Sequence, residues 1–291
     1  MPELPEVEVV RAGLEPAVVG AVVTSVAVLD ERSLKRHDGP AEDFIARLTG
    51  RTFLAPRRRG KFLWIPLAPA GGEALVVHLG MSGQVLLRAP DAAADPLTRI
   101  RIEIAHPDHG LLRVAFVDQR IFGSMAIDQL VETPDVAGDT VPTQVAHIAR
   151  DPLDPAFDDR RFLASLARRN TGIKRALLDQ TLISGVGNIY ADESLWAARV
   201  HYDQPTSTLS RARATTLLAE LRLVLERALA DGGTSFDAQY VNVNGASGYF
   251  SHSLNAYGQQ GRGCPRCGRT IVRERFMNRG SHLCTFCQRI R

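Results

Sequence analysis

The sequence predicts an α+β protein of several domains, and three observations support that prediction. The chain has 291 residues, more than the roughly 100 to 200 of one domain. Apolar segments such as Phe62–Ile65 are typical of strands, whereas leucines recur with a helical period between Ser210 and Ala230. All four cysteines lie within the last 28 residues. We therefore expect a strand-rich part, a helical part and a small cysteine-containing part, in that order.

The bulk composition is that of an ordinary globular protein. Hydrophobic residues make up 45% of the chain and charged residues 23%, which excludes the disordered and membrane classes. No stretch reaches the roughly 18 apolar residues of a membrane span, and the first residues are acidic and proline-rich instead of basic and then apolar. We expect a cytoplasmic protein. The net charge of +3 permits a nucleic-acid partner without requiring one.

Basic residues are concentrated at the C-terminal end. From Gly258 onward the chain has eight arginines and a single acidic residue, Glu274. Such a run is either a solvated or disordered tail, or a surface that binds nucleic acid. The cysteines in the same segment favour a folded module.

The cysteines form two C-x2-C pairs, Cys264 with Cys267 and Cys284 with Cys287, separated by sixteen residues. Each pair directs two thiolates at one point, and two pairs on a β-hairpin supply the tetrahedral set that one structural zinc ion requires. The alternative is two disulfides in a secreted protein. Without a signal peptide or further cysteines, that alternative has little support.

The segment between the cysteine pairs is expected to form the hairpin. Thr270–Phe276 has the composition of a strand, and Asn278–Gly280 can turn the chain back. Arg279, at this turn, is the side chain best placed to project outward and contact a phosphate or a groove.

The N-terminus carries a candidate nucleophile. The chain begins Met1-Pro2-Glu3-Leu4-Pro5-Glu6, and removal of Met1 would expose the secondary amine of Pro2. Because α-amino groups titrate at about 7.7 to 8.0, this amine can attack a sugar near neutral pH and form an iminium. Glu3 lies beside it and can shuttle protons. Alternatively, Pro5 simply opens a helix, and both interpretations can hold together.

The middle of the chain changes character after a loop at about residues 132–156. Four segments are expected to be helices, 160–169, 174–179, 191–199 and 210–230. Between two of them, Gly185–Asn188 is a tight turn whose small residues let backbone amides and Asn188 approach a phosphate. The glycine pair alone is weak support for such a site.

These residues resemble the formamidopyrimidine-DNA glycosylase family at both ends of the chain. The opening MPELPEVEVV is similar to the family's N-terminus, and CPRCG with CTFCQ is similar to its closing zinc finger. Six internal blocks continue the resemblance in family order. They are Arg58–Leu63, His78–Gly83, Asp118–Gly123, Ile173–Lys174, Gly185–Glu193 and Gly248–Phe250.

The resemblance implies the architecture in detail. It implies an N-terminal antiparallel β-sandwich with a leading helix, a helix-two-turns-helix domain and a C-terminal β-hairpin zinc finger. The expected ranges are 1–132 for the catalytic β-sandwich domain, 133–152 for a linker, 153–232 for the helix-two-turns-helix DNA-binding domain, 233–257 for a lesion-capping loop and connector, and 258–291 for the zinc finger. DNA is expected to bind across the cleft between the two larger domains.

The resemblance also implies residue roles. The expected catalytic residues are Pro2, Glu3, Glu6, Lys61 and Arg279, and the expected DNA-binding residues are Met81, Arg120, Phe122, Lys174 and Asn188. In the family, a methionine, an arginine and an aromatic residue enter the duplex after the lesion everts. Taken singly, Met81 would be assigned to the core and Lys61 to a solvated surface. Lys174 and Asn188 match the residues that grip the DNA backbone.

Two segments leave alternatives open. Thr234–Gly248 is either the loop that folds over the everted base or a linker to the cysteine module, and its composition favours neither. Family members often carry a lysine and two histidines where this chain has Pro96–Arg101. Arg99 or Arg101 is a candidate substitute for those phosphate contacts.

The expected function is therefore that of a bifunctional glycosylase and lyase that excises oxidised purines, acts as a monomer on double-stranded damaged DNA, and needs zinc but no redox or nucleotide cofactor. One alternative is an oxidised-pyrimidine glycosylase of the same superfamily, whose members resemble MPEGPE at the start and lack the methionine, arginine and phenylalanine pattern. The other is a non-catalytic zinc-finger DNA-binding protein, which loss of Pro2, Glu3 or Lys61 would indicate. All three residues are present.

Overall fold

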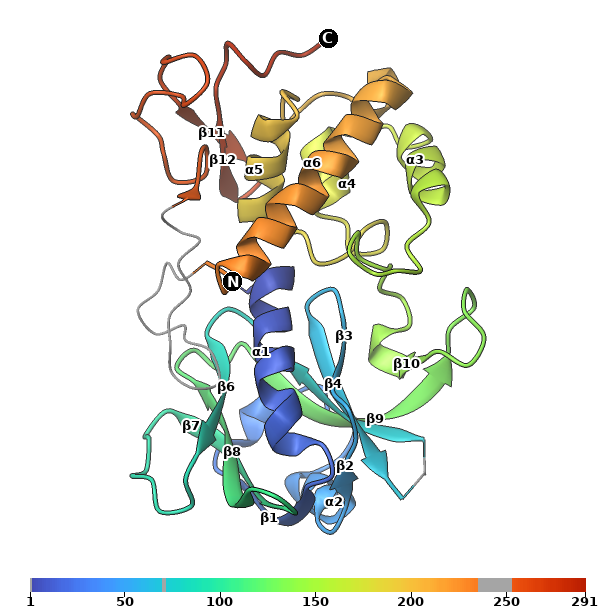
Figure 1. The fold of residues 1–291 in the computed structure, drawn as a ribbon, viewed down its shortest axis with the longest axis vertical. Helices are drawn as coiled ribbons and strands as arrows, with labels where there is room; N and C mark the ends of the chain where they lie inside the picture. Colours follow the sequence, from blue (N-terminus) through green and yellow to red (C-terminus); the bar gives the residue numbers. More distant parts are fainter. Residues whose placement is uncertain (1, 70–71, 235–252) are drawn as a thin grey trace. The chain divides into compact units, whose positions relative to one another are not determined.

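The computed structural model describes residues 2–69, 72–234 and 253–291 (Figure 1). The chain forms two compact units: among the described residues, the first contains 2–147 and the second contains 148–234 with 253–291. Helices and antiparallel strands occur together, so the prediction of an α+β multidomain fold is confirmed. The finer division into five segments stays a prediction.

The first unit is built mainly of strands. Its described helices are α1 (Leu4–Val18), η1 (Glu31–Leu34), α2 (Ala41–Leu48) and η2 (Thr143–Val145). Its strands are β1 (Val22–Val28), β2 (Thr52–Phe53), β3 (Arg57–Arg59), β4 (Phe62–Ala68), β5 (Glu73–His78), β6 (Gly83–Arg88), β7 (Thr98–His106), β8 (Gly110–Asp118), β9 (Ser124–Glu132) and β10 (Thr140–Pro142).

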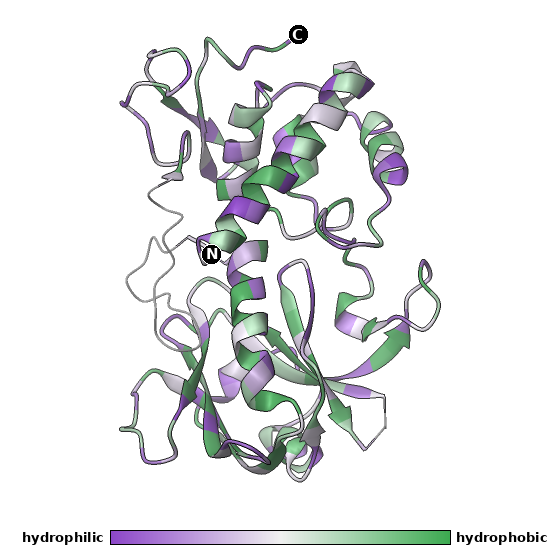
Figure 2. Ribbon diagram, in the orientation of Figure 1, coloured by the Kyte–Doolittle hydropathy of each residue, from purple (hydrophilic) through white to green (hydrophobic). Residues whose placement is uncertain are grey.

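These strands form one antiparallel ladder in the order β10-β9-β5-β4-β2-β1-β7-β8-β6, with β3 paired to β4. Burial alternates along most of β7, as expected for a strand with one face on the core. Leu63 and Val77 from one half of the ladder share a core with Ile102 and Phe116 from the other half. The ladder thus folds into two layers, as predicted, and hydrophobic residues dominate its strands in Figure 2.

Helix α1 packs into the same core. Val7, Val10 and Leu14 are spaced three and four residues apart, so they form one buried stripe. Pro5 occupies the first turn, where the fixed φ of proline suits a helix start and its missing N–H leaves no bond unmade. The core therefore fixes the position of the residues that begin the chain.

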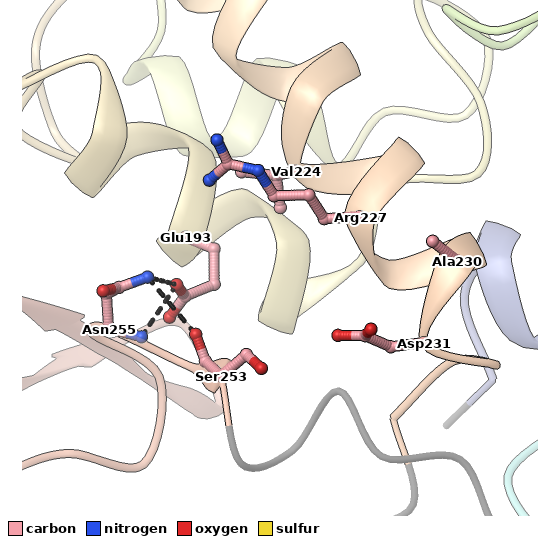
Figure 3. Close-up of a pocket in the computed structure, with 7 residues that line it drawn as sticks. All are labelled: Glu193, Val224, Arg227, Ala230, Asp231, Ser253 and Asn255. Carbon is pink, nitrogen blue, oxygen red and sulfur yellow. Dashed lines mark hydrogen bonds between the residues drawn. The ribbon is translucent and has the colours of Figure 1, made fainter.

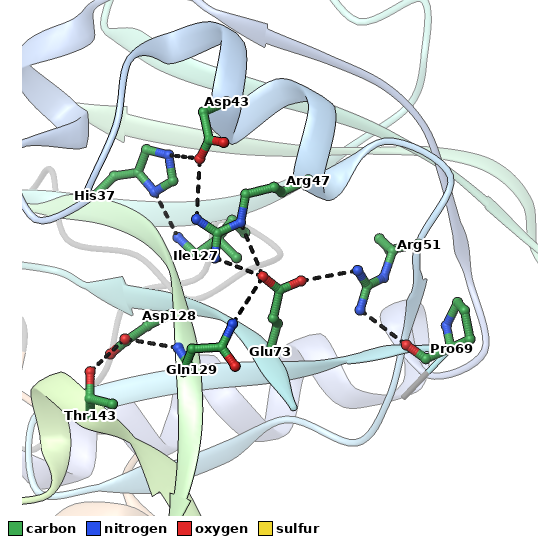
Figure 4. Close-up of polar contacts among 10 residues, drawn as sticks. All are labelled: His37, Asp43, Arg47, Arg51, Pro69, Glu73, Ile127, Asp128, Gln129 and Thr143. Carbon is green, nitrogen blue, oxygen red and sulfur yellow. Dashed lines mark hydrogen bonds and ion pairs between the residues drawn. The ribbon is translucent and has the colours of Figure 1, made fainter. Parts of the chain in front are cut away.

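A charged network ties α2 to the edge of the sheet (Figure 4). The Glu73 carboxylate lies 2.7 Å from Arg47 and 3.0 Å from Arg51. Asp43 lies 3.1 Å from Arg47 and 3.1 Å from Nε2 of His37, whose Nδ1 accepts the N–H of Ile127. Since these charges lie beside opposite charges, the network stabilises the contact between α2 and the start of β5.

The second unit is mainly helical. Its described helices are α3 (Asp159–Ala167), α4 (Ile173–Leu177), α5 (Asn188–Ala197), η3 (Thr206–Thr208) and α6 (Arg211–Ala230). The four predicted α-helices are present, with ends shifted by at most three residues. The side chains of Asp158 and Ser210 cap α3 and α6 by accepting backbone N–H groups. Leucines of α6, such as Leu221 and Leu225, face the interior.

The cysteine segment folds as the predicted β-hairpin, from β11 (Val272–Phe276) and β12 (Arg279–Leu283). The turn lies at Met277 and Asn278, one residue earlier than expected, with Met277 at φ 54°. Arg279 is consequently the first residue of β12, paired with Phe276, and it is exposed. None of the helices in the described ranges is long and apolar enough to cross a membrane.

Candidate functional site

The start of the chain holds two acids in fixed positions beside Pro2. Glu3 is the N-cap of α1, and Glu6 lies in the first turn. The Glu6 carboxylate accepts the backbone N–H of Glu3 at 2.8 Å, and both side chains are only 2% exposed. Glu6 thus fixes the backbone next to Pro2, which is itself buried. The geometry gives Glu6, an expected catalytic residue, a local positioning function at the start of α1.

Lys61 lies in the turn between β3 and β4, directly after Gly60, and is partly buried. The resemblance implied a catalytic function for Lys61, and taken singly the residue would be assigned to a solvated surface. The structure places it in a turn at the end of a strand pair. On the neighbouring strand β5, His78 pairs with Phe62. Burial, followed by the charges of Arg36, Lys61 and Lys35, lowers the pKa of His78 to about 4. His78 is therefore neutral at pH 7 within a cluster of cations.

Met81, Arg120 and Phe122 lie on two loops that end strands of the same sheet. Met81 follows β5 in the Leu79–Ser82 turn, and the other two residues follow β8. The Met81 and Phe122 side chains are 43% and 48% exposed, and Arg120 is also exposed. Apolar side chains of this size are normally buried. Their joint exposure on adjacent loops agrees with the orientation that the sequence predicts for a wedge.

The two candidate substitutes for family phosphate contacts differ in their surroundings. Arg99 donates from Nε to the carbonyl of Asp118 at 2.8 Å, so part of its guanidinium supports the end of β8. Arg101 lies 3.6 Å from Glu103 and is 41% exposed. Both residues are partly exposed.

In the second unit, the predicted tight turn precedes α5. Gly185 has φ +84°, a conformation that favours glycine, and Gly187 is the N-cap of the helix. Asn188 is the first helical residue, and its Nδ2 donates to the carbonyl of Gly280 at 3.2 Å. Its Oδ1 is buried and accepts no hydrogen bond from the described residues. A buried polar atom without a partner is uncommon, so this amide is a candidate ligand-binding group.

Lys174 occupies an interior position. Its side chain is fully buried, and Nζ lies 2.6 Å from Asp192 and 3.3 Å from the carbonyl of Gly280. The ammonium also lies over the Phe276 ring, 4.9 Å from its centroid. The sequence predicted a DNA backbone contact for Lys174. In the structure its charge is instead directed at α5 and the hairpin, so a direct contact with phosphate would require this group to be exposed first.

Asp192 joins α5 to the hairpin strand β12. Its carboxylate accepts hydrogen bonds from Ser281 Oγ at 2.9 Å and from the His282 N–H at 2.8 Å, and it lies 3.0 Å from His282 Nδ1. Together with Lys174, these contacts compensate a carboxylate that is only 1% exposed.

The four cysteine sulfurs gather at the other end of α5. All four lie within 4.8 Å of one another, and Cys267 Sγ is 3.5 Å from Cys284 Sγ. A tetrahedral ion with metal–sulfur bonds of about 2.3 Å needs sulfur separations of roughly 3.8 Å. The cysteines of the hairpin module therefore form a structural metal site. These are the four cysteines that the C-x2-C spacing predicted as metal ligands.

Two contacts attach this metal site to α5. Trp196 donates its indole N–H to Cys264 Sγ at 3.4 Å. Burial by itself would raise the pKa of the Cys264 thiol, but this bond and backbone N–H groups of the knuckle lower it to about 6. Arg266 stacks over Trp196 and donates to the carbonyls of Trp196 and Ala197 in the last turn of α5, where carbonyls have few partners within the helix.

Glu193 anchors the segment that begins at Ser253. Its carboxylate accepts the backbone N–H and the side-chain amide of Asn255 (Figure 3). It also accepts the N–H groups of Ala256 and Tyr257. Burial raises the pKa of Glu193 in spite of these bonds. The cavity beside it has a volume of about 210 Å³, and it is also lined by Arg227 of α6 and by Asp231, which directly follows α6. Most of the predicted lesion-capping loop, Thr234–Gly248, lies outside the described residues, as does Met1.

Asp192 and Glu193 are the functional residues that the sequence analysis missed. Both residues lie in the Gly185–Glu193 block of the resemblance, but a function was predicted only for the Gly185–Asn188 turn. The available signal was two adjacent acids inside an otherwise apolar helix, which are costly to bury unless each has several partners. His78 was not predicted either, because Met81 was the only residue of the His78–Gly83 block with an expected function.

Three family models match the chain. They are the formamidopyrimidine-DNA glycosylase N-terminal domain at residues 1–125, the formamidopyrimidine-DNA glycosylase H2TH domain at residues 148–239, and the zinc finger found in FPG and IleRS at residues 264–290. Together they match the three domains of the predicted fold class.

Similar proteins agree with these matches over the full chain. The formamidopyrimidine-DNA glycosylase of Leifsonia xyli subsp. xyli is 67% identical, with all of both chains covered. That of Thermobifida fusca is 54% identical, covering 99% of this chain and 97% of the relative. A crystal structure of the Lactococcus lactis Fpg with DNA containing an abasic site is 30% identical, covers 99% of each chain and has a TM-score of 0.83.

A catalytic β-sandwich, an H2TH domain and a cysteine hairpin on one chain define a DNA-binding repair enzyme. The chain belongs to the formamidopyrimidine-DNA glycosylase family. It is a DNA glycosylase of base excision repair, in a family with glycosylase and AP lyase activity, and DNA is its partner.

Proposed function

We propose that this enzyme excises oxidised purines, 8-oxoguanine and formamidopyrimidines, and then nicks the strand. The observation that carries the proposal is the arrangement at the start of α1, where Glu6 fixes Glu3 beside Pro2. A Lactococcus lactis Fpg that is 30% identical to this chain over 99% of its length has been crystallised with DNA containing N7-benzyl-Fapy-dG. That relative supports a damaged purine as the substrate.

The proposed reaction uses the free amine of Pro2 after removal of Met1. Its nitrogen lone pair attacks C1′ of the damaged nucleotide, and the glycosidic bond breaks, so the base departs with the bonding electrons and takes up a proton. Glu3 assists proton transfer as the sugar opens to an iminium. Loss of a proton from C2′ then expels the 3′ phosphate, and loss of a further sugar proton expels the 5′ phosphate. Water finally hydrolyses the iminium and releases Pro2.

The DNA contacts in this proposal come from both units. Met81, Arg120 and Phe122 enter the duplex, and their exposure supports that function. Lys61 acts at the phosphate beside the active site, and neutral His78 next to it can donate a hydrogen bond without adding charge. In the second unit, Asn188 contacts the backbone and the exposed Arg279 reaches a phosphate or a groove. We assign Lys174 to holding this turn in place.

The remaining parts of the proposal concern the metal and the assembly. One zinc ion per chain would be bound by the four cysteines, which would supply folding energy to the hairpin and leave no open position for catalysis. The enzyme would act as a monomer, without a nucleotide cofactor, on DNA in the cytoplasm.

Borohydride trapping tests the proposal. Mature protein is incubated with a duplex containing 8-oxoguanine, the mixture is reduced, and the adduct is mapped by mass spectrometry. An adduct on Pro2 is the expected result, and Glu3→Gln should slow excision while an abasic duplex still traps. Trapping with an oxidised pyrimidine alone would overturn the substrate assignment and keep the mechanism. If neither duplex traps, the protein would be better described as a DNA-binding protein without glycosylase and lyase activity.

A further inference from the structure

The two loops that carry Met81, Arg120 and Phe122 are joined by one buried carboxylate. Asp118 is the last residue of β8 and is fully buried. Its carboxylate accepts Ser82 Oγ at 2.6 Å, the Arg120 N–H at 3.1 Å and the Gly123 N–H at 2.7 Å. The first bond reaches the loop of Met81, and the other two close the loop of Arg120.

A cation holds the opposite side of the second loop. Lys35, directly after η1, donates from Nζ to the carbonyls of Ile121 and Phe122, at 3.0 and 2.9 Å. Ile121 adopts φ 56°, a conformation that costs free energy for a branched residue. Asp118 thus binds N–H groups of this loop and Lys35 binds its carbonyls. Hydrogen bonds to charged groups are stronger than neutral ones, so the strained conformation is maintained.

Glycines allow the two loops to touch through their backbones. A Cβ at Gly80 would overlap the backbone of Phe122 and Gly123. A Cβ at Gly123 would lie 2.7 Å from the Phe116 ring and 2.8 Å from the carbonyl of His78. Neither loop can shift without the other, so the exposed side chains project from one rigid base.

We propose that Asp118 is a positioning residue for insertion into the duplex, and that Lys35 completes this function from the carbonyl side. The proposal rests on the function proposed above for Met81, Arg120 and Phe122. Asp118 does not touch DNA in this proposal. It preorganises the loops, so the side chains enter the base stack without first being ordered.

The structure offers a matched control for Asp118. The Asp128 carboxylate on β9 also accepts one hydroxyl, from Thr143, and two backbone N–H groups, from Gln129 and Gln144 (Figure 4). It belongs to the same sheet but contacts neither wedge loop. Asp118→Asn and Asp128→Asn therefore remove the same charge from carboxylates that each accept three hydrogen bonds, and only the first acts on the loops. Asp128 is the less buried of the two.

Two assays separate positioning from chemistry. The first is stopped-flow fluorescence of 2-aminopurine placed opposite the lesion in an 8-oxoguanine duplex, which reports insertion. The second is borohydride trapping on a single-stranded oligonucleotide with an abasic site, which needs the Pro2 amine but no insertion. Asp118→Asn should slow insertion about tenfold, as expected from weakening a few bonds to one carboxylate. Its single-stranded trapping should match that of Asp128→Asn.

Lys35→Met keeps the proposal testable if Asp118→Asn fails to fold. Its control is Arg32→Met on the short helix that precedes Lys35, which removes equal charge from an ion pair of the exposed Arg32 side chain with Asp30. Insertion should be several-fold slower for Lys35→Met than for Arg32→Met. The proposal would be overturned if each variant inserted as fast as its control. It would also be overturned if Asp118→Asn lost single-stranded trapping by the same factor as insertion. If wild-type protein neither traps nor inserts, the proposed function itself fails.

Discussion

Lys174 Nζ lies 2.6 Å from Asp192 Oδ1, and neither side chain is more than 1% exposed. The pair links α4 to α5, and through Ser281 and His282 it reaches the hairpin. The stability of a buried ion pair depends on both partners. If one is removed, the other still carries the free-energy cost of its desolvation but no longer gains the attraction of the opposite charge.

Breaking this pair should destabilise the second unit strongly. Lys174→Met is expected to lower the free energy of unfolding by about 3 to 5 kcal/mol, because it removes the buried cation that compensates the Asp192 charge and leaves only the contacts with Ser281 and His282. Denaturant unfolding measures the change. Glu15→Gln, in the partly exposed pair of Arg11 and Glu15, should cost less than about 1 kcal/mol. Equal costs for the two variants would show that Lys174 is hydrated in solution.

Stability should fall on acidification because of His78. Its folded-state pKa is lowered from 6.5 to about 4 by burial and by nearby cations, so the unfolded chain binds the proton first. The contribution is complete above pH 6.5 and is lost as the pH falls toward 4, amounting to about 3 kcal/mol at most. His78→Gln should flatten the stability profile in this interval. The exposed His109→Gln is the control, and an unchanged profile in His78→Gln would refute the assignment.

Gly80→Ala separates steric overlap from backbone strain. Gly80 and Gly110 have φ +64° and +70°, but a Cβ at Gly110 would meet nothing within 4 Å. Gly110→Ala should therefore show only the strain of a positive φ, about 1 kcal/mol. Gly80→Ala should cost a further 1 to 3 kcal/mol or so, because the Phe122 backbone must move. Thermal unfolding of both variants measures the difference, and similar melting temperatures would contradict the close packing of the two loops.

Metal removal should be visible through Trp196. The chain has two tryptophans, of which Trp196 bonds Cys264 and Trp64 lies in the buried part of β4. A chelator should release the proposed zinc, unfold the hairpin and change the fluorescence of Trp196. The change should vanish in Trp196→Phe and remain in Trp64→Phe. Retention of the change in Trp196→Phe would place its origin elsewhere.

The sequence was sufficient for the parts that follow local rules. An apolar segment predicted the strand at Phe62–Ile65, leucine periodicity predicted α6, and cysteine spacing predicted the metal site, because each pattern depends on neighbours close in the chain. The β-sandwich as a whole was predicted through the resemblance. The exposure of Met81 and Phe122 was also predicted, although through the resemblance and not through composition.

Partners distant in the sequence could not be predicted in this way. Nothing near Lys174 indicates that its charge meets Asp192, eighteen residues later, and Gly280 beyond it. The same holds for Lys35, whose acceptors lie 86 and 87 residues away. These contacts are set by the tertiary fold, and a single sequence carries no periodicity that reports them.

Helix α5 is held by the hairpin module along its whole length, from Asn188 through Asp192 to Trp196. Binding equilibria that share a structural element are linked, and the linkage acts equally in both directions. A ligand that stabilises the Gly185–Asn188 turn, such as a bound phosphate, should then increase the affinity of the four cysteines for their metal. Conversely, the metal affinity of this protein is a property of α5 as much as of its four ligands.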